Sequence, residues 1–207
     1  MVPPLSEAML DVVADALVDK GYVLLSDIIP QEVSLALLAK MRAAAIWEFE
    51  PAAIGRGIDQ QIDTKIRADK ISWLDKKDAV DNDYLQLMEQ LREGLNRRLF
   101  MGLFDYESHY AVYESGAFYR KHVDALKGSQ NRILTTVFFL NPHWQTDHGG
   151  ELIIYDEDDS QLETVPPRMG TMAIFMSERF PHEVRESFAT RISIAGWFRV
   201  SHATHGF

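Results

Sequence analysis

The C-terminal half of the chain contains RILTTVFFLN (132–141) and RISIAGWFRV (191–200), two runs dominated by β-branched and aromatic residues. Shorter runs of the same kind surround them: HYAVYES (109–115), FYRKHVD (118–124), GELIIYD (150–156), TMAIFM (171–176) and HEVRE (182–186). Turn residues separate the runs, and no stripe of helix length interrupts them. Strands in such a series favour an antiparallel barrel or a two-sheet jelly roll over a parallel α/β sheet.

The residues ahead of these runs show helical periodicity instead. In three segments, apolar residues recur every three or four positions. The first stripe is Leu10, Val13, Ala14 and Leu17, the second is Val33, Leu37, Leu38 and Met41, and the third is Tyr84, Leu87, Met88, Leu91, Leu95 and Leu99. Ser6 and Gly21 are placed to begin and end the first helix, and Asp81, Asn82 or Asp83 to cap the third. We expect these helices to buttress one face of the barrel.

Residues 47–77 lack a sustained helical face and predict a long loop that ends in a short strand at 71–74. A loop of this length in a compact domain is typical of a lid or a binding loop. With no linker-like composition between the halves, we expect one α+β domain over 1–207. Mainly helical support would span 1–107, and a double-sheet β core would span 108–200.

Composition restricts the possible functions of the 207 residues. Thirty-one acidic against twenty-one basic side chains give a formal charge of −10, which is unfavourable for binding a nucleic acid backbone. No cysteine occurs, so any bound metal must use histidine and carboxylate ligands. No run of about 18 apolar residues and no signal-like N-terminus is present. We therefore expect a cytoplasmic protein without membrane or nucleic acid partners.

His122 and Asp124 lie two positions apart in a predicted strand, so their side chains would share one face. His182 begins another predicted strand and could supply a third ligand. Two imidazoles and one carboxylate on one side of a cation form the facial arrangement of non-heme Fe(II) oxygenases. A short His-x-Asp pattern also arises by chance, and His182 by itself is more typical of a surface or core histidine.

Arg191 lies in an apolar strand, nine positions after His182. A cation among apolar residues is costly to bury unless it is paired, and a guanidinium matches a carboxylate in a bidentate geometry. The carboxylate could belong to a ligand. It could equally belong to a protein acid such as Glu151 or Glu183.

The order His122, Asp124, His182 and Arg191 resembles that of the 2-oxoglutarate- and Fe(II)-dependent dioxygenases, whose core is a double-stranded β-helix. Longer blocks resemble the hypoxia-inducible-factor prolyl hydroxylase catalytic domain and its small bacterial counterparts. They are RADKISWLD (67–75), YESGAFYRKHVD (113–124), RILTTVFFLNPHW (132–144), HGGELIIY (148–155), PHEV (181–184) and ATRISIAGWF (189–198). The likeness covers roughly residues 67–199.

This resemblance implies His122, Asp124 and His182 as iron ligands and Arg191 as the partner of the distal carboxylate of 2-oxoglutarate. It implies that the cosubstrate pocket is lined by Tyr113, Val137, Leu152, Val184 and Trp197. Tyr119 would lie beside the metal near the target proline, and Asp69 and Arg132 would form an entrance salt bridge. Residues 54–70 would correspond to the segment that folds over the bound substrate.

Two positions depart from the family pattern. Phe139 stands where the animal enzymes have a tyrosine whose hydroxyl helps to hold the 2-oxoglutarate carboxylate. Thr135 and Tyr113 are the candidate replacement donors. Ala195 stands where a threonine is expected near the site, which could alter how water and oxygen reach the iron.

The resemblance implies protein prolyl 4-hydroxylation with Fe(II), O2 and 2-oxoglutarate, giving succinate and CO2, with ascorbate as a candidate reductant. By the same resemblance, elongation factor Tu is the expected protein substrate. Two alternatives stay open: a 2-oxoglutarate oxygenase of a free amino acid or other small molecule, and a metal-binding jelly-roll module without turnover. The long loop over 54–70 favours a protein substrate over a small one, and Arg191 favours turnover over a purely structural metal site.

Overall fold

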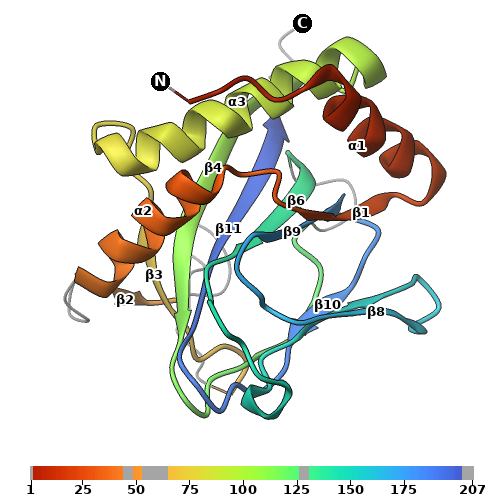
Figure 1. Cartoon of the computed structure of the whole chain (residues 1–207). Helices are drawn as coiled ribbons and strands as arrows, with labels where there is room; N and C mark the ends of the chain where they lie inside the picture. Colours follow the sequence, from red (N-terminus) through yellow and green to blue (C-terminus); the bar gives the residue numbers. More distant parts are fainter. Residues whose placement is uncertain (1, 44–48, 53–64, 126–130, 202–207) are drawn as a thin grey trace, which may run out of the picture.

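The computed structural model of the protein describes residues 2–43, 49–52, 65–125 and 131–201. Three helices lie across one face of a large sheet, and a smaller sheet lies beyond its other face (Figure 1). The helices are α1 (Glu7–Asp19), α2 (Gln31–Ala43) and α3 (Ala79–Leu99). In the described ranges no helix is long and apolar enough to cross a membrane.

The apolar stripes predicted from the sequence face the large sheet. Their members are buried in one cluster with residues from the sheet, apart from Leu99, which is partly buried against it. Ser6 caps α1 as predicted, with its hydroxyl accepting from the Met9 N–H. The predicted cap of α3 is wrong, because Asp78 accepts the N–H groups of the first turn. Asp81 lies buried inside the helix and accepts a hydrogen bond from the Tyr110 hydroxyl at 2.6 Å.

The larger sheet has seven strands in the order β1-β9-β6-β11-β4-β3-β2. They are β1 (Tyr22–Ser26), β2 (Glu50–Pro51), β3 (Lys70–Trp73), β4 (Leu103–Tyr113), β6 (Arg132–Phe139), β9 (Thr171–Met176) and β11 (Arg191–Val200). The smaller sheet has the order β5-β10-β7-β8, from β5 (Tyr119–His122), β10 (His182–Val184), β7 (Leu152–Tyr155) and β8 (Gln161–Val165). Two facing antiparallel sheets confirm the predicted double-stranded β-helix core.

Three strands were not predicted. β1 lies between the first two predicted helices, where no element was assigned, and it extends the larger sheet beside β9. β2 falls within residues 47–77, which predicted a loop up to the strand at 71–74. β8 is polar and largely exposed, so its sequence lacks the apolar alternation of a core strand. The short 3-10 helix η3 (Thr146–His148) precedes β7, and no α-helix interrupts the described strands after β4.

Alternation along β11 divides its residues between two environments. Ile194 and Phe198 belong to the cluster beneath the helices. Arg191, Ser193 and Trp197 lie on the opposite face, which the pleat of the strand turns toward the smaller sheet. A second apolar cluster fills this space with residues from β6, β7, β8 and β9. Arg191 and Ser193 are therefore buried between the two sheets.

Candidate active site

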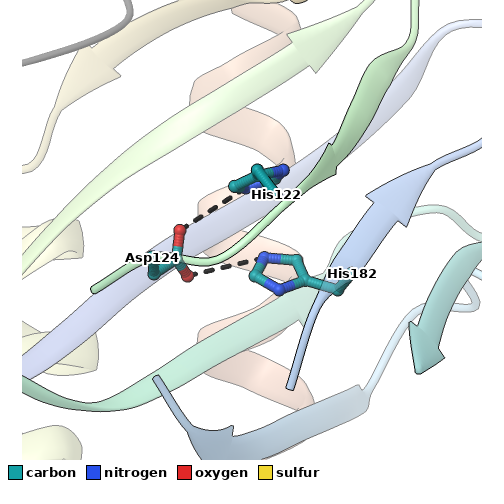
Figure 2. Close-up of side chains that lie close together, drawn as sticks. All are labelled: His122, Asp124 and His182. Carbon is teal, nitrogen blue, oxygen red and sulfur yellow. Dashed lines mark ion pairs between the residues drawn. The ribbon is translucent and has the colours of Figure 1, made fainter. Parts of the chain in front are cut away.

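His122, Asp124 and His182 converge between the two sheets (Figure 2). β5 and β10 pair in antiparallel fashion with His182 directly opposite His122, and Asp124 follows two residues after the end of β5. The Nε2 atoms of His122 and His182 each lie 3.5 Å from one oxygen of Asp124. One ligand atom from each residue lies within 4.8 Å of the others.

Backbone carbonyl groups fix the orientation of both imidazoles. Nδ1 of His122 lies 2.8 Å from the Arg120 carbonyl oxygen, and Nδ1 of His182 lies 3.0 Å from that of Phe180. A neutral histidine that donates its Nδ1–H to a carbonyl keeps a lone pair on Nε2. Both Nε2 atoms face Asp124, so the cluster presents two nitrogen lone pairs and a carboxylate toward one point.

The ionisation states suit cation binding. Burial alone would raise the pKa of Asp124, but the adjacent His182 and His122 outweigh it and hold the pKa of this carboxyl well below its usual range. Burial lowers the pKa of His182 to about 4, so its imidazole is neutral near pH 7. The Thr135 hydroxyl donates to Asp124 Oδ2 at 2.8 Å and lies 2.9 Å from the Ser177 hydroxyl.

These three residues fit an Fe(II) ion bound on one face. Two neutral imidazoles and one carboxylate are the donor set of non-heme Fe(II) sites with open positions for further ligands. The carbonyl contacts of the imidazoles and the Thr135 contact of the carboxylate orient the ligands before any ion binds.

Arg191 lies deep in the same space and is 1% exposed. Its Nε donates to the Gly150 carbonyl at 2.8 Å, and its Nη1 donates to the Ser193 hydroxyl at 3.0 Å. The buried Nη2 has no hydrogen-bond partner among the described residues. Because an arginine stays charged in a protein, this unpaired donor marks a buried positive charge that an anion could neutralise.

Neither protein acid considered from the sequence neutralises Arg191. In the described part of the chain no ion pair joins Arg191 to Glu151 or Glu183, and Glu183 accepts instead from the Tyr155 hydroxyl at 2.7 Å. The rings of Tyr113 and Phe139 lie 4.7 and 5.1 Å from the guanidinium carbon. A ligand carboxylate is the alternative that remains compatible with this geometry.

The predicted pocket residues are buried around this space. Val137 and Leu152 belong to the apolar cluster between the sheets, and Tyr113 and Val184 belong to a neighbouring cluster. Trp197 is 6% exposed, and its indole lies beside the Asp124 carboxylate and helps to lower the pKa of that carboxyl. The walls around the guanidinium are therefore apolar and aromatic.

Sequence reasoning missed Ser193 as a polar group of this pocket. Its hydroxyl contacts Arg191, and it pairs in register with Phe139 on β6, the position where a tyrosine was expected. Thr135 contacts Asp124 and Ser177 instead. The spacing of Arg191 and Ser193 carried the signal, because residues two apart in a strand share a face.

The expected Asp69–Arg132 salt bridge is wrong. Asp69 pairs with Arg67, with Nε–Oδ1 at 2.6 Å, whereas Arg132 pairs with Glu107 at 2.8 Å and lies 3.5 Å from the Trp197 ring centroid. Asp69 pairs with an arginine two residues away in the segment ahead of β3, whereas Arg132 on β6 reaches across β11 to Glu107 on β4.

Tyr119 lies beside the candidate metal ligands as predicted. Its ring stacks on that of His122, with the two ring centroids 3.6 Å apart. Of the proposed substrate segment 54–70, residues 54–64 lie outside the described ranges. Another residue missed by sequence reasoning is His109, which is 2% exposed and pairs in register with Ala195. Its ring packs beside Trp197, with the two ring centroids 5.4 Å apart.

Comparison with known proteins agrees with this architecture. The sequence profile of the 2OG-Fe(II) oxygenase superfamily matches residues 108–199. A prolyl-4-hydroxylase of Pseudomonas putida of known crystal structure is 38% identical, with a TM-score of 0.84 and coverage of 92% of this chain and 99% of that chain. A Trichoplax adhaerens prolyl hydroxylase solved with a hypoxia inducible factor peptide shares the fold at a TM-score of 0.81, with 24% identity and coverage of 93% and 90%.

Among curated proteins, rat Egl nine homolog 1 is 27% identical over an alignment of 206 positions that covers 94% of this chain and 60% of that protein. Mouse prolyl hydroxylase EGLN3 is also 27% identical, over 94% of this chain and 84% of that protein. The chain thus spans less than two thirds of the length of the first of these relatives. From the profile, the extensive likeness to the Pseudomonas enzyme and the shared core, the chain belongs to the 2OG-Fe(II) oxygenase superfamily and, within it, to the prolyl 4-hydroxylase family.

Proposed function

We propose that the protein hydroxylates a proline of a protein substrate at C4, using Fe(II), O2 and 2-oxoglutarate. The observation that carries this proposal is a buried guanidinium with an orphaned Nη2 donor in the same inter-sheet space as a His–Asp–His cluster. A structural metal site needs no buried receptor for an anion. A dioxygenase that consumes an oxo diacid needs both features.

In this proposal His122, Asp124 and His182 hold the iron. With 2-oxoglutarate and O2 the bound metal supplies the oxidation of a C–H bond to C–OH, with release of succinate and CO2. The protein contributes ligand orientation, through the carbonyl contacts of the two imidazoles. It also contributes a space lined by buried apolar residues, which excludes competing water.

Arg191 would bind the distal carboxylate of 2-oxoglutarate through its free Nη2. The Ser193 hydroxyl accepts from Nη1, so its own hydrogen is available to donate to the same carboxylate. Ser193 would thereby replace the hydroxyl that Phe139 lacks. Tyr113, Val137, Leu152, Val184, Thr135 and Trp197 complete the proposed cosubstrate pocket, with Thr135 acting through its bond to Asp124.

The substrate would enter beside Tyr119, Asp69 and Arg132. Tyr119 contacts His122, and Arg132 contacts Trp197, so both lie next to the proposed reaction centre. We extend the proposal to one dioxygenase domain over residues 1–207, because the helices and the larger sheet share one apolar cluster.

Elongation factor Tu is the protein substrate that we propose, on the likeness to small bacterial prolyl hydroxylases, and the cytoplasm is the corresponding location. Purified protein would be incubated with elongation factor Tu, Fe(II), 2-oxoglutarate and ascorbate, followed by peptide mass spectrometry. We expect one proline to gain one oxygen atom, with the Asp124→Ala variant as the inactive control. An unmodified factor under conditions of 2-oxoglutarate turnover would reject this substrate.

The same assay separates the other functions considered. Oxidation of a free amino acid with no modified peptide would identify a small-molecule oxygenase. Anaerobic addition of 2-oxoglutarate to the Fe(II)-loaded protein should produce a metal-to-ligand absorption band. A protein that binds Fe(II) at the His–Asp–His cluster without this band would be a metal-binding module without turnover.

A further inference from the structure

The proposed metal ligand His122 lies on a strand with irregular pairing. β5 is the edge of the smaller sheet, and its register with β10 shifts between His182 and Val184. A shift of this kind disrupts the ladder locally and leaves the strand more dependent on side-chain packing. The position of the His122 ring therefore needs support beyond the backbone of β5.

A short segment ahead of β3 supplies this support on the other edge of β5. The Ala68 N–H donates to the Phe118 carbonyl at 3.1 Å, and the Arg120 N–H donates to the Ile66 carbonyl at 2.9 Å. Arg67 lies between these bonds, directly opposite Tyr119. The segment is thus attached to the strand that carries His122.

The side chains of this pairing form a three-layer stack. The Tyr119 and His122 rings lie 3.6 Å apart between centroids, at an interplanar angle of 17°. The guanidinium carbon of Arg67 lies 4.6 Å from the Tyr119 centroid. Because His122 covers one face of the tyrosine ring, the guanidinium occupies the other face, where a cation is attracted by the π-system.

The outer layer of the stack is itself fixed. Arg67 donates to both oxygens of Asp69, at 2.6 Å from Nε and 2.8 Å from Nη2. The Asp69 side chain is fully buried, and its backbone carbonyl accepts from the Ala52 N–H at 3.0 Å. A bidentate pair with one buried partner holds the guanidinium plane in a single orientation.

We propose that Arg67 is a positioning residue of the metal centre, which clamps Tyr119 against His122 and so fixes the plane of this imidazole. The inference rests on the proposed assignment of His122 as a metal ligand. Groups that orient a ligating histidine generally contribute to metal affinity without touching the metal. The clamp also fixes the place of the Tyr119 ring at the entrance of the site.

The test measures Co(II) binding by calorimetry and by visible absorption, which reports ligand geometry without turnover. The main variant is Arg67→Gln/Asp69→Asn, which removes both charges together so that no buried carboxylate is left unpaired. We expect about 10-fold weaker Co(II) binding, as for loss of other outer contacts of ligating histidines, and an altered absorption spectrum. Arg67→Lys should retain part of the affinity, because it keeps the cation but loses the planar two-point contact.

Arg98→Gln is the matched control, because Arg98 on α3 pairs with two acids of α1, Glu7 and Asp11, on the helical side of the larger sheet. It should leave Co(II) affinity and spectrum unchanged. Tyr119→Phe keeps a ring between the two partners and should retain more Co(II) affinity than a variant without the ring. Tyr119→Leu removes the ring and should weaken binding. In the Tyr119→Leu background the Arg67 and Asp69 substitutions should cause no further loss.

Wild-type affinity and spectrum in both Arg67→Gln/Asp69→Asn and Tyr119→Leu would overturn the clamp, provided that His122→Ala loses Co(II) binding. Fully additive losses in the combined variant would also overturn it, because they would show that Arg67 does not act through Tyr119. Co(II) binding retained by His122→Ala would reject the metal site itself and the clamp with it. The two failures are therefore distinguishable.

Discussion

Arg191 combines complete burial with an incomplete set of hydrogen bonds. Two of its nitrogens donate to the Gly150 carbonyl and the Ser193 hydroxyl, and Nη2 has no partner in the described residues. Burial lowers the pKa of this guanidinium, although Tyr113 and Asp69 act in the opposite direction. This buried charge without a counterion lowers the stability of the free protein, and an anion that binds to Arg191 removes that cost.

Arg191→Gln should therefore weaken 2-oxoglutarate binding by about 100-fold, the effect of removing one member of a buried charge pair. Ser193→Ala should weaken it by about 10-fold, because it removes one hydrogen bond to a charged group. Calorimetric titration of the Co(II)-loaded protein with 2-oxoglutarate measures both. Co(II) affinity itself is the control and should not change. Normal 2-oxoglutarate affinity in Ser193→Ala would exclude this serine as the replacement for the missing tyrosine.

His109 provides a pH test that does not involve the metal ligands. Burial lowers its pKa from 6.5 to about 4 in the folded protein. Between these values the unfolded chain binds more protons than the folded one, so stability falls as pH is lowered from 6.5 to 4. The full loss attributable to this residue is about 3 kcal/mol, at ~1.4 kcal/mol per pKa unit.

Urea unfolding of the metal-free protein at pH 7, 5.5 and 4.5 measures this dependence. His109→Leu should unfold with a shallower pH dependence than the wild type over the same window. Identical slopes for the two proteins would show that His109 already titrates normally in the folded state.

At the level of the elements, β11 is constrained by what its neighbours place against its backbone. A Cβ atom on Gly196 would meet the Tyr106 hydroxyl, which is held by the hydroxyls of Thr136 at 2.7 Å and Tyr84 at 3.3 Å. The tyrosine cannot move aside without breaking these bonds. Glycine is therefore required here for close approach, not for an unusual backbone angle.

Gly196→Ala should destabilise the protein by about 2 kcal/mol, within the usual range for overpacking a core. Thermal unfolding followed by circular dichroism measures the loss. The double variant Gly196→Ala/Tyr106→Phe removes the clashing hydroxyl and should destabilise less than the sum of the two single changes. If the destabilisation of the double variant equals the sum of the two single changes, the clash with the Tyr106 hydroxyl is not the cause of the loss in Gly196→Ala.

Across the whole molecule, ligand binding should raise stability, because the site is built from strands of both sheets. His122 and His182 come from the smaller sheet, and Arg191 comes from the larger one. Co(II) and 2-oxoglutarate together at 100 times their dissociation constants should stabilise the fold by about 2.7 kcal/mol for each ligand. The melting temperature should rise by about 5–10 °C per ligand for a chain of this size.

Differential scanning fluorimetry measures this shift, and a chelator should reverse the part due to the metal. Asp124→Ala should show no response to Co(II) and little to 2-oxoglutarate. A full 2-oxoglutarate shift in Asp124→Ala without metal would mean that the diacid binds independently of the proposed metal site.

Most strands of the two-sheet core could be predicted from the amino-acid sequence, together with the faces on which Arg191, His122 and Asp124 lie. A period of two is a local property, so Arg191 in an apolar run already predicted a buried cation, and His122 and Asp124 already formed a candidate pair. The helical stripes were equally readable, because a period near 3.6 needs no knowledge of the partner surface. β1 was missed because its apolar run YVLL does not reveal the buried and exposed alternation of its side chains, and β8 was missed because it is largely exposed.

The contacts between these residues depend on how the strands are arranged in space, and no local pattern predicts them. The chain contains several arginines that could pair with Asp69. Asp69 pairs with Arg67 instead of Arg132 because of distances that no local sequence pattern encodes. The contact of Ser193 with Arg191 and the stack of Arg67, Tyr119 and His122 likewise required the arrangement of strands in space. The periodicity of the sequence predicts the face of a strand on which a side chain lies. The residue that it contacts there depends on the packing of the two sheets, which brings together residues far apart in the sequence.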